Sequence, residues 1–114
     1  MAVEQHLEQG VLTLQLHRPD KKNALTRAMY STLASALDAA QDNPEVRVIL
    51  LTGGSQCFTS GNDLQDFLQG GALAEDSPVF HFMRALFDCG KPVVAAVAGP
   101  AVGIGTTLLL HCDL

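Results

Sequence analysis

The chain has 114 residues, of which 47% are hydrophobic and 17% charged, a composition typical of one small globular domain. Its net charge of −5 argues against nucleic acid as the main partner. The first residues lack the basic start and apolar core of a secretory leader, and the three cysteines are widely spaced. The longest apolar run is far shorter than the about 20 residues of a membrane span. These features predict a cytoplasmic protein that does not enter membranes.

The first part of the chain predicts a hairpin followed by an amphipathic helix. Residues 3–7 and 11–17 read as two strands around Gly10, because apolar and polar residues alternate in the second of them. A loop over residues 18–23 leads to Thr26, where a helix begins. One apolar stripe of that helix is formed by Met29, Leu33, Leu37 and Ala40.

Strands and helices then alternate along the chain. Residues 46–52 and 93–98 are nearly continuous apolar runs, which predicts strands buried on both faces in a parallel sheet. We expect helices near residues 63–68, 77–88 and 106–112, the second of them with Pro78 at its first position. This alternation predicts an α/β fold with parallel strands.

Two glycine-containing loops, residues 53–64 and 98–107, follow the buried strands. Ligands bind at the carboxyl ends of such strands, and glycines allow the backbone to approach a ligand closely. Two loops side by side could direct two N–H groups at one oxygen, which is the requirement for an oxyanion hole. The spacing alone favours plain structural loops, since most glycine loops are only turns.

Four of the seven basic residues lie within residues 18–27. They are Arg18, Lys21, Lys22 and Arg27. This cluster indicates either a solvated loop or a binding site for the phosphates of a ligand.

Four motifs together resemble the enoyl-CoA hydratase/isomerase, or crotonase, family. They are residues 23–25 (NAL), 58–64 (FTSGNDL), 91–99 (KPVVAAVAG) and 103–114 (GIGTTLLLHCDL). They occur in family order and correspond to the N-terminal half of the family's domain. The resemblance implies a crotonase-like ββα superhelix of the ClpP/crotonase type, with residues 1–114 as the N-terminal portion of a single domain that assembles as homotrimers or hexamers.

The same resemblance implies an acyl-CoA substrate and a set of site residues. The backbone N–H groups of Asn62 and Ile104 would form the oxyanion hole, and Ala24 would lie beside the coenzyme A moiety. The other residues expected to line the substrate are Ser60, Gly61, Asp63 and Leu64. Coenzyme A enters only as part of the substrate, so no separate cofactor is expected. No His, Asp and Glu set has the spacing of metal ligands, so no metal is expected either.

One position departs from the hydratase pattern. Thr107 stands where hydratases of the family carry a glutamate, and a hydroxyl cannot replace a carboxylate as general base. The chain therefore looks most like the Δ3,Δ2-enoyl-CoA isomerase branch of fatty-acid metabolism, whose carboxylate would lie beyond Leu114. As general bases, His81 and His111 are weak candidates, since a lone histidine is more often structural; Cys57 and Cys112, as nucleophiles, lack a base partner.

Two other readings stay open at this point. One is a different crotonase reaction, such as atypical hydration, thioester hydrolysis or decarboxylation. The other is an acyl-CoA-binding scaffold without catalytic activity.

Overall fold

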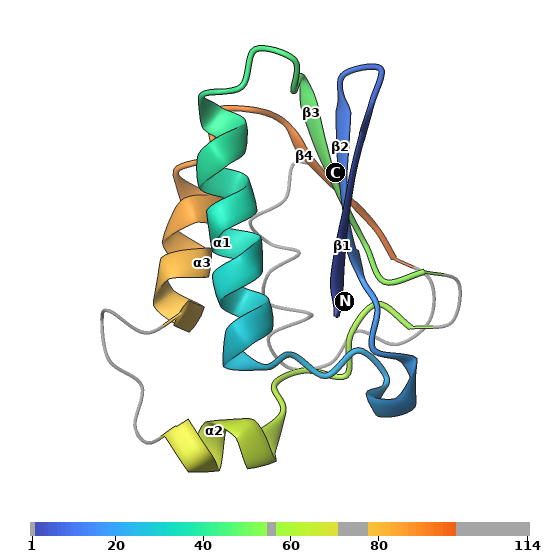
Figure 1. Ribbon diagram of the computed structural model, residues 1–114, viewed down its shortest axis with the longest axis vertical. Helices are drawn as coiled ribbons and strands as arrows, with labels where there is room; N and C mark the ends of the chain where they lie inside the picture. Colours follow the sequence, from blue (N-terminus) through green and yellow to red (C-terminus); the bar gives the residue numbers. More distant parts are fainter. Residues whose placement is uncertain (1, 55–56, 71–77, 98–114) are drawn as a thin grey trace.

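A computed structural model describes residues 2–54, 57–70 and 78–97 of the protein (Figure 1). The elements in chain order are β1 (Val3–Glu8), β2 (Val11–Leu16), the 3-10 turn η1 (Pro19–Lys21), α1 (Arg27–Gln41), β3 (Val48–Thr52), α2 (Leu64–Gly70), α3 (Pro78–Phe87) and β4 (Val93–Ala96). In these ranges no helix is both long enough and apolar enough to cross a bilayer.

The strands form one mixed sheet in the order β1-β2-β3-β4. β1 and β2 are antiparallel and are joined by a tight turn in which Gln9 and Gly10 both have positive φ, as a two-residue hairpin requires. β3 then pairs in parallel with β2, and β4 pairs in parallel with β3. The predicted hairpin and the predicted parallel strands are both confirmed.

Helix α1 begins where the sequence predicts. Thr26 is the N-cap, and its side-chain oxygen accepts a hydrogen bond of 3.1 Å from the Met29 N–H. The predicted apolar stripe is buried against the sheet and α3, and it extends to Tyr30. The other two expected helices in the described ranges, α2 and α3, are also present, the latter starting at Pro78.

Lys91 closes the other end of α1. Its Nζ donates to the carbonyl oxygens of Ala40, at 2.5 Å, and Asn43, at 2.6 Å. Each carbonyl also accepts a main-chain N–H, that of Asn43 at 3.3 Å for Ala40 and that of Val46 at 3.1 Å for Asn43. The negative end of the helix dipole favours a cation there. Lys91 thereby connects the segment before β4 to the C-terminus of α1.

The prediction that both faces of the later strands are buried is wrong for the described residues. In β3, Ile49 and Leu51 are buried while Val48, Leu50 and Thr52 are partly exposed, and in β4 only Val93 is buried. The reason is that α1 and α3 lie on the same face of the sheet (Figure 1). β3 also begins at residue 48 rather than 46, because the residue 46 N–H bonds to a turn carbonyl.

Candidate active site

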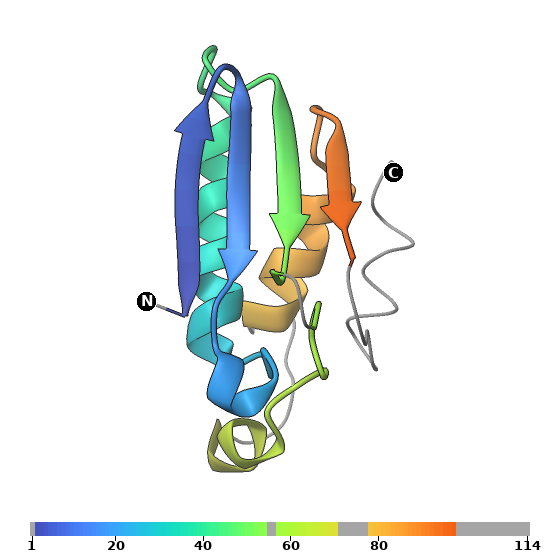
Figure 2. The same ribbon diagram turned by 90° about the vertical axis from the view of Figure 1, so that its right-hand side faces the viewer.

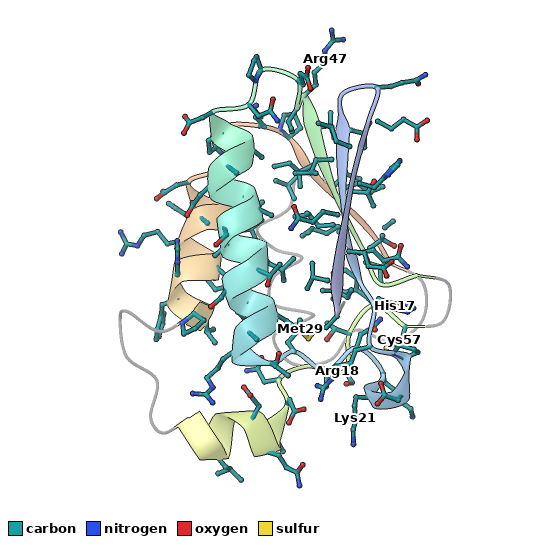
Figure 3. All side chains as sticks on the ribbon, in the orientation of Figure 1. His17, Arg18, Lys21, Met29, Arg47 and Cys57 are labelled. Atoms are coloured by element: carbon teal, nitrogen blue, oxygen red, sulfur yellow. The ribbon has the colours of Figure 1, made fainter. Side chains whose placement is uncertain are left out.

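The carboxyl ends of β2, β3 and β4 meet at one edge of the sheet (Figure 2). The segments that follow β2 and β3 come together there. Arg18, Lys21 and Cys57 all lie at this end of the molecule, whereas Arg47 lies at the opposite end (Figure 3). Segments that are distant along the chain therefore lie together at this end of the sheet.

Asn23 joins the two segments. Its Nδ2 donates to the carbonyl oxygens of Gly53 (2.9 Å), Cys57 (3.0 Å) and Phe58 (3.2 Å), and its Oδ1 accepts from the Arg18 N–H at 2.7 Å. Asn23 is buried and has φ of 58°, a conformation that asparagine adopts more readily than most residues. A Cβ on Gly53 would lie 2.3 Å from the Cys57 and Phe58 oxygens, so only glycine allows this contact.

The main chain around Asn23 makes further bonds to the second segment. The Thr59 hydroxyl donates to the Asn23 carbonyl at 2.6 Å, and the Ser60 N–H donates to the Lys22 carbonyl at 3.0 Å. Thr59 is fully buried, which strengthens its bond to Asn23 because water does not compete for it. Residues 57–60 are thus fixed relative to the loop after β2.

The backbone of Asn62 is held in an extended conformation by a parallel bridge to Leu25. Leu25 donates its N–H to Gly61 and accepts from the Asp63 N–H, both at 2.8 Å. In this pairing the N–H of the central residue, Asn62, points away from Leu25. No acceptor in the described part of the chain takes that N–H. Gly61 permits the preceding turn with a φ of 99°.

The side chain of Asn62 is held from helix α1. The Tyr30 hydroxyl donates to Asn62 Oδ1. Tyr30 is completely buried, and its ring packs against Phe82 of α3 with 5.5 Å between ring centroids. Burial raises the pKa of the Tyr30 phenol, so the hydroxyl stays protonated and remains a donor.

The carboxylate of Asp63 is held by neighbouring residues. It accepts from the Asp66 N–H at 3.0 Å and pairs with Arg18 at 2.7 Å. The Asp66 bond first, and then Arg18, lower the pKa of Asp63. Arg18 also donates to the Ala24 carbonyl at 3.0 Å. A carboxylate with a lowered pKa and these partners is a poor general base.

The basic cluster is divided between two roles. Arg18 pairs with Asp63, and Arg27 donates to the Asp66 carboxylate from its N–H at 2.8 Å and from its Nε at 3.2 Å. Asp66 thereby connects the start of α2 to the start of α1. Lys21 and Lys22 are exposed, so they are the two side chains of the cluster that remain available to bind the phosphates of a ligand.

The other predicted site residues are distributed as follows. Ala24 and Ser60 are half-buried near Asn62, while Leu64 is 75% exposed on α2. His81 pairs with Asp38 at 2.8 Å on an exposed part of the two helices. Outside the described residues lie loop 98–107, the helix expected at 106–112, Ile104, Thr107, His111 and Cys112. The convergence of Asn62 and Ile104 on one oxygen therefore stays a prediction.

The described residues also line a small apolar cavity. It has a volume of about 10 Å³ and is lined by Leu16, Leu25, Leu33, Leu51, Phe58 and Phe82. This space is too small for an acyl chain. A second, shallow hollow beside Arg47 lies at the opposite end of the sheet from the candidate site. No group of three or more His, Cys, Asp or Glu in the described ranges could hold a metal ion.

Two residues with clear roles in this site were not assigned a role from the sequence. In the sequence, Asn23 stands out only as part of a motif, and Tyr30 only as a residue inside a predicted helix. The signal for Tyr30 was available: it is the single tyrosine of the chain and adjoins the apolar stripe of α1. A buried tyrosine hydroxyl requires a hydrogen-bond partner. Its partner could not be known without the fold.

Comparison with known proteins agrees with this architecture. OdaA of Pseudomonas aeruginosa is 63% identical, with a TM-score of 0.96 over 99% of this chain and 46% of that one. An enoyl-CoA hydratase/isomerase of Pseudoalteromonas atlantica is 40% identical, with a TM-score of 0.93 over 100% of this chain and 45% of that one. Human enoyl-CoA delta isomerase 2 is 38% identical over 90% of this chain and 27% of its own length.

The two solved structures share the crotonase-type fold over the matched region. The chain spans less than half of the length of each of the three relatives. A sequence model of one family, described as enoyl-CoA hydratase/isomerase, matches residues 6–114. The chain belongs to the enoyl-CoA hydratase/isomerase family, of whose domain it covers a part.

Proposed function

We propose that the complete protein carrying this chain is an acyl-CoA enzyme that stabilises a thioester enolate in a backbone oxyanion hole. The observation that supports this most is the Asn62 N–H, which points away from Leu25 and has no acceptor in the described residues. A rigid main-chain donor of this kind costs no reorganisation during the reaction, and one such donor contributes about 3 kcal/mol to transition-state stabilisation.

The proposed reaction moves a carbon–carbon double bond. The thioester carbonyl accepts hydrogen bonds from the N–H groups of Asn62 and Ile104. A base removes a proton from the α-carbon of a 3-enoyl-CoA, and the negative charge that develops on the oxygen is held by the same two groups. Return of the proton to the γ-carbon gives the 2-enoyl isomer. Asp63 is unsuited as the base, because its pKa is lowered and Arg18 occupies it.

Thr107 supports isomerisation over simple hydration, because the glutamate of the hydratases is replaced there. The 38% sequence identity to human enoyl-CoA delta isomerase 2 is consistent with isomerisation. A relative named for the hydratase reaction matches at the same 38% identity, so the preference depends on Thr107.

The remaining features of the complete protein are part of the same proposal. Exposed Lys21 and Lys22 would meet the coenzyme A phosphates beside Ala24. Ser60, Gly61 and Leu64 would line the substrate. The protein would act in the cytoplasm as a homotrimer or hexamer, with no cofactor besides the coenzyme A of its substrate.

The test is to give the purified complete protein 3-enoyl-CoA thioesters of several chain lengths. The expected product is the conjugated 2-enoyl-CoA, detected by its ultraviolet absorbance. In parallel, 2-enoyl-CoA should keep its conjugation if hydration is absent, and free thiol should not appear if hydrolysis is absent. Binding of the thioesters without any turnover would instead support the scaffold reading.

The second oxyanion donor can be tested by a pair of substitutions. Ile104→Pro removes the N–H and should lower kcat by about a hundredfold or more. Ile104→Ala keeps the N–H and should retain most of the activity, which controls for the loss of the side chain. Equal activity of the two variants would show that the Ile104 N–H does not stabilise the enolate.

A further inference from the structure

Tyr30 connects the rigid core to the residue that would donate to the substrate. It lies in the second turn of α1, is completely buried, and packs against Phe82 of α3. Its main-chain N–H bonds to the Thr26 carbonyl at 3.1 Å, so both backbone and ring are fixed. Its hydroxyl reaches across to Asn62 Oδ1, 32 positions later in the chain.

The bridge to Leu25 does not hold the side chain of Asn62. Leu25 holds the main-chain groups of the two residues beside Asn62, Gly61 and Asp63, and makes no bond to Asn62 itself. Gly61, which precedes it, has a φ of 99° and lacks a side chain that could limit its motion. The contact from Tyr30 restricts the side-chain torsions of Asn62.

From this geometry we infer that Tyr30 is a positioning residue for the oxyanion hole: its hydroxyl holds Asn62 so that the Asn62 N–H stays directed at the thioester oxygen. The inference rests on the proposed function, because it gives the Asn62 N–H that role. Burial raises the pKa of the phenol, so the hydroxyl remains a donor over the pH range of an assay. A misdirected donor weakens stabilisation of the transition state more than it weakens substrate binding.

The first test compares the kinetics of Tyr30→Phe with wild type in the complete protein. Loss of the hydroxyl should lower kcat on the order of tenfold and leave KM nearly unchanged. Tyr30→Phe should cause no further loss in an Asn62→Ala background, because both changes remove the same contact. Multiplying losses in the double variant, or an unchanged kcat, would overturn the inference.

A stability control separates positioning from general loosening of the fold. Lys91→Met removes the cap at the far end of α1 and should lower Tm without changing kcat. If Lys91→Met lowered kcat as much as Tyr30→Phe at a similar Tm, the effect of Tyr30 would be structural only, and the inference would be wrong.

The second test does not depend on turnover. The infrared stretch of an isotope-labelled carbonyl in a bound, saturated acyl-CoA should move to lower frequency in the wild-type protein, and Tyr30→Phe should reverse part of that shift. A shift that Tyr30→Phe retains in full would overturn the inference about Tyr30 alone. No shift in the wild-type protein would overturn the oxyanion hole itself, and the inference with it.

Discussion

Asn23 holds together segments that lie 30 to 35 positions apart in the chain. Its amide is buried and every one of its polar atoms has a partner among main-chain groups. Such a residue could be recognised in the sequence only as a motif member. The partners of its side chain are main-chain groups of two loops, and the residue types of a sequence do not show which main-chain groups will need a partner.

Asn23→Ala should destabilise the protein by about 3 kcal/mol, because it leaves buried carbonyl groups without donors and retains an unfavourable positive φ. Urea denaturation of both proteins measures this difference. The matched control is Asn43→Ala, which removes one exposed bond to the Glu45 N–H and should cost less than about 1 kcal/mol. Equal costs for the two variants would contradict the role of Asn23.

Asp63 should make stability depend on pH. Its pKa is lowered from the ordinary 3.8 in the folded state, chiefly by the Asp66 N–H and then by Arg18. The unfolded chain therefore binds the proton more readily, so the stabilising contribution is present above pH 3.8 and is lost as the pH falls through the folded pKa.

Asp63→Asn tests this pH dependence, because the variant lacks the carboxylate that stabilises the folded state above pH 3.8. The variant should be less stable than wild type near neutral pH, and the difference should shrink as the pH falls below 3.8. Urea midpoints measured at several pH values for both proteins give the difference directly. A gap that stays constant down to acid pH would show that the Asp63 carboxylate is not stabilised by folding.

At the level of elements, local sequence determined most of the fold. The Thr26 cap, the apolar stripe of α1 and Pro78 at the start of α3 all act within a few residues of where they stand, so their elements were predictable. The one-sided burial of β3 was not predictable, because an apolar run does not show whether one or both faces of a sheet are covered. That depends on where α1 and α3 pack.

The C-terminal end of α1 is held by Lys91, a residue about 50 positions later in the chain. Lys91→Met should destabilise the protein by about 2 kcal/mol, because two carbonyls at the end of α1 lose a charged donor. Thermal unfolding should show the lower Tm. Lys21→Met is the matched control: this exposed side chain should contribute no more than about 0.5 kcal/mol. A loss as large at Lys21 would argue against the cap.

For the whole molecule, family membership and the crotonase-type fold were predictable from motif order, since the four motifs span nearly the entire chain. The candidate site was predictable in part. The sequence placed Asn62 after a buried strand, and the structure shows its N–H turned away from Leu25. The contact with Tyr30 was not predictable, because it depends on how α1 packs on the face of the sheet.

The central claim is that the main chain of Asn62 binds the thioester oxygen. A crystal structure of the complete protein with an unreactive acyl-CoA analogue measures this directly. The account predicts that the nitrogens of Asn62 and Ile104 both lie within about 3 Å of the thioester oxygen. A bound analogue whose carbonyl contacts neither nitrogen would contradict it.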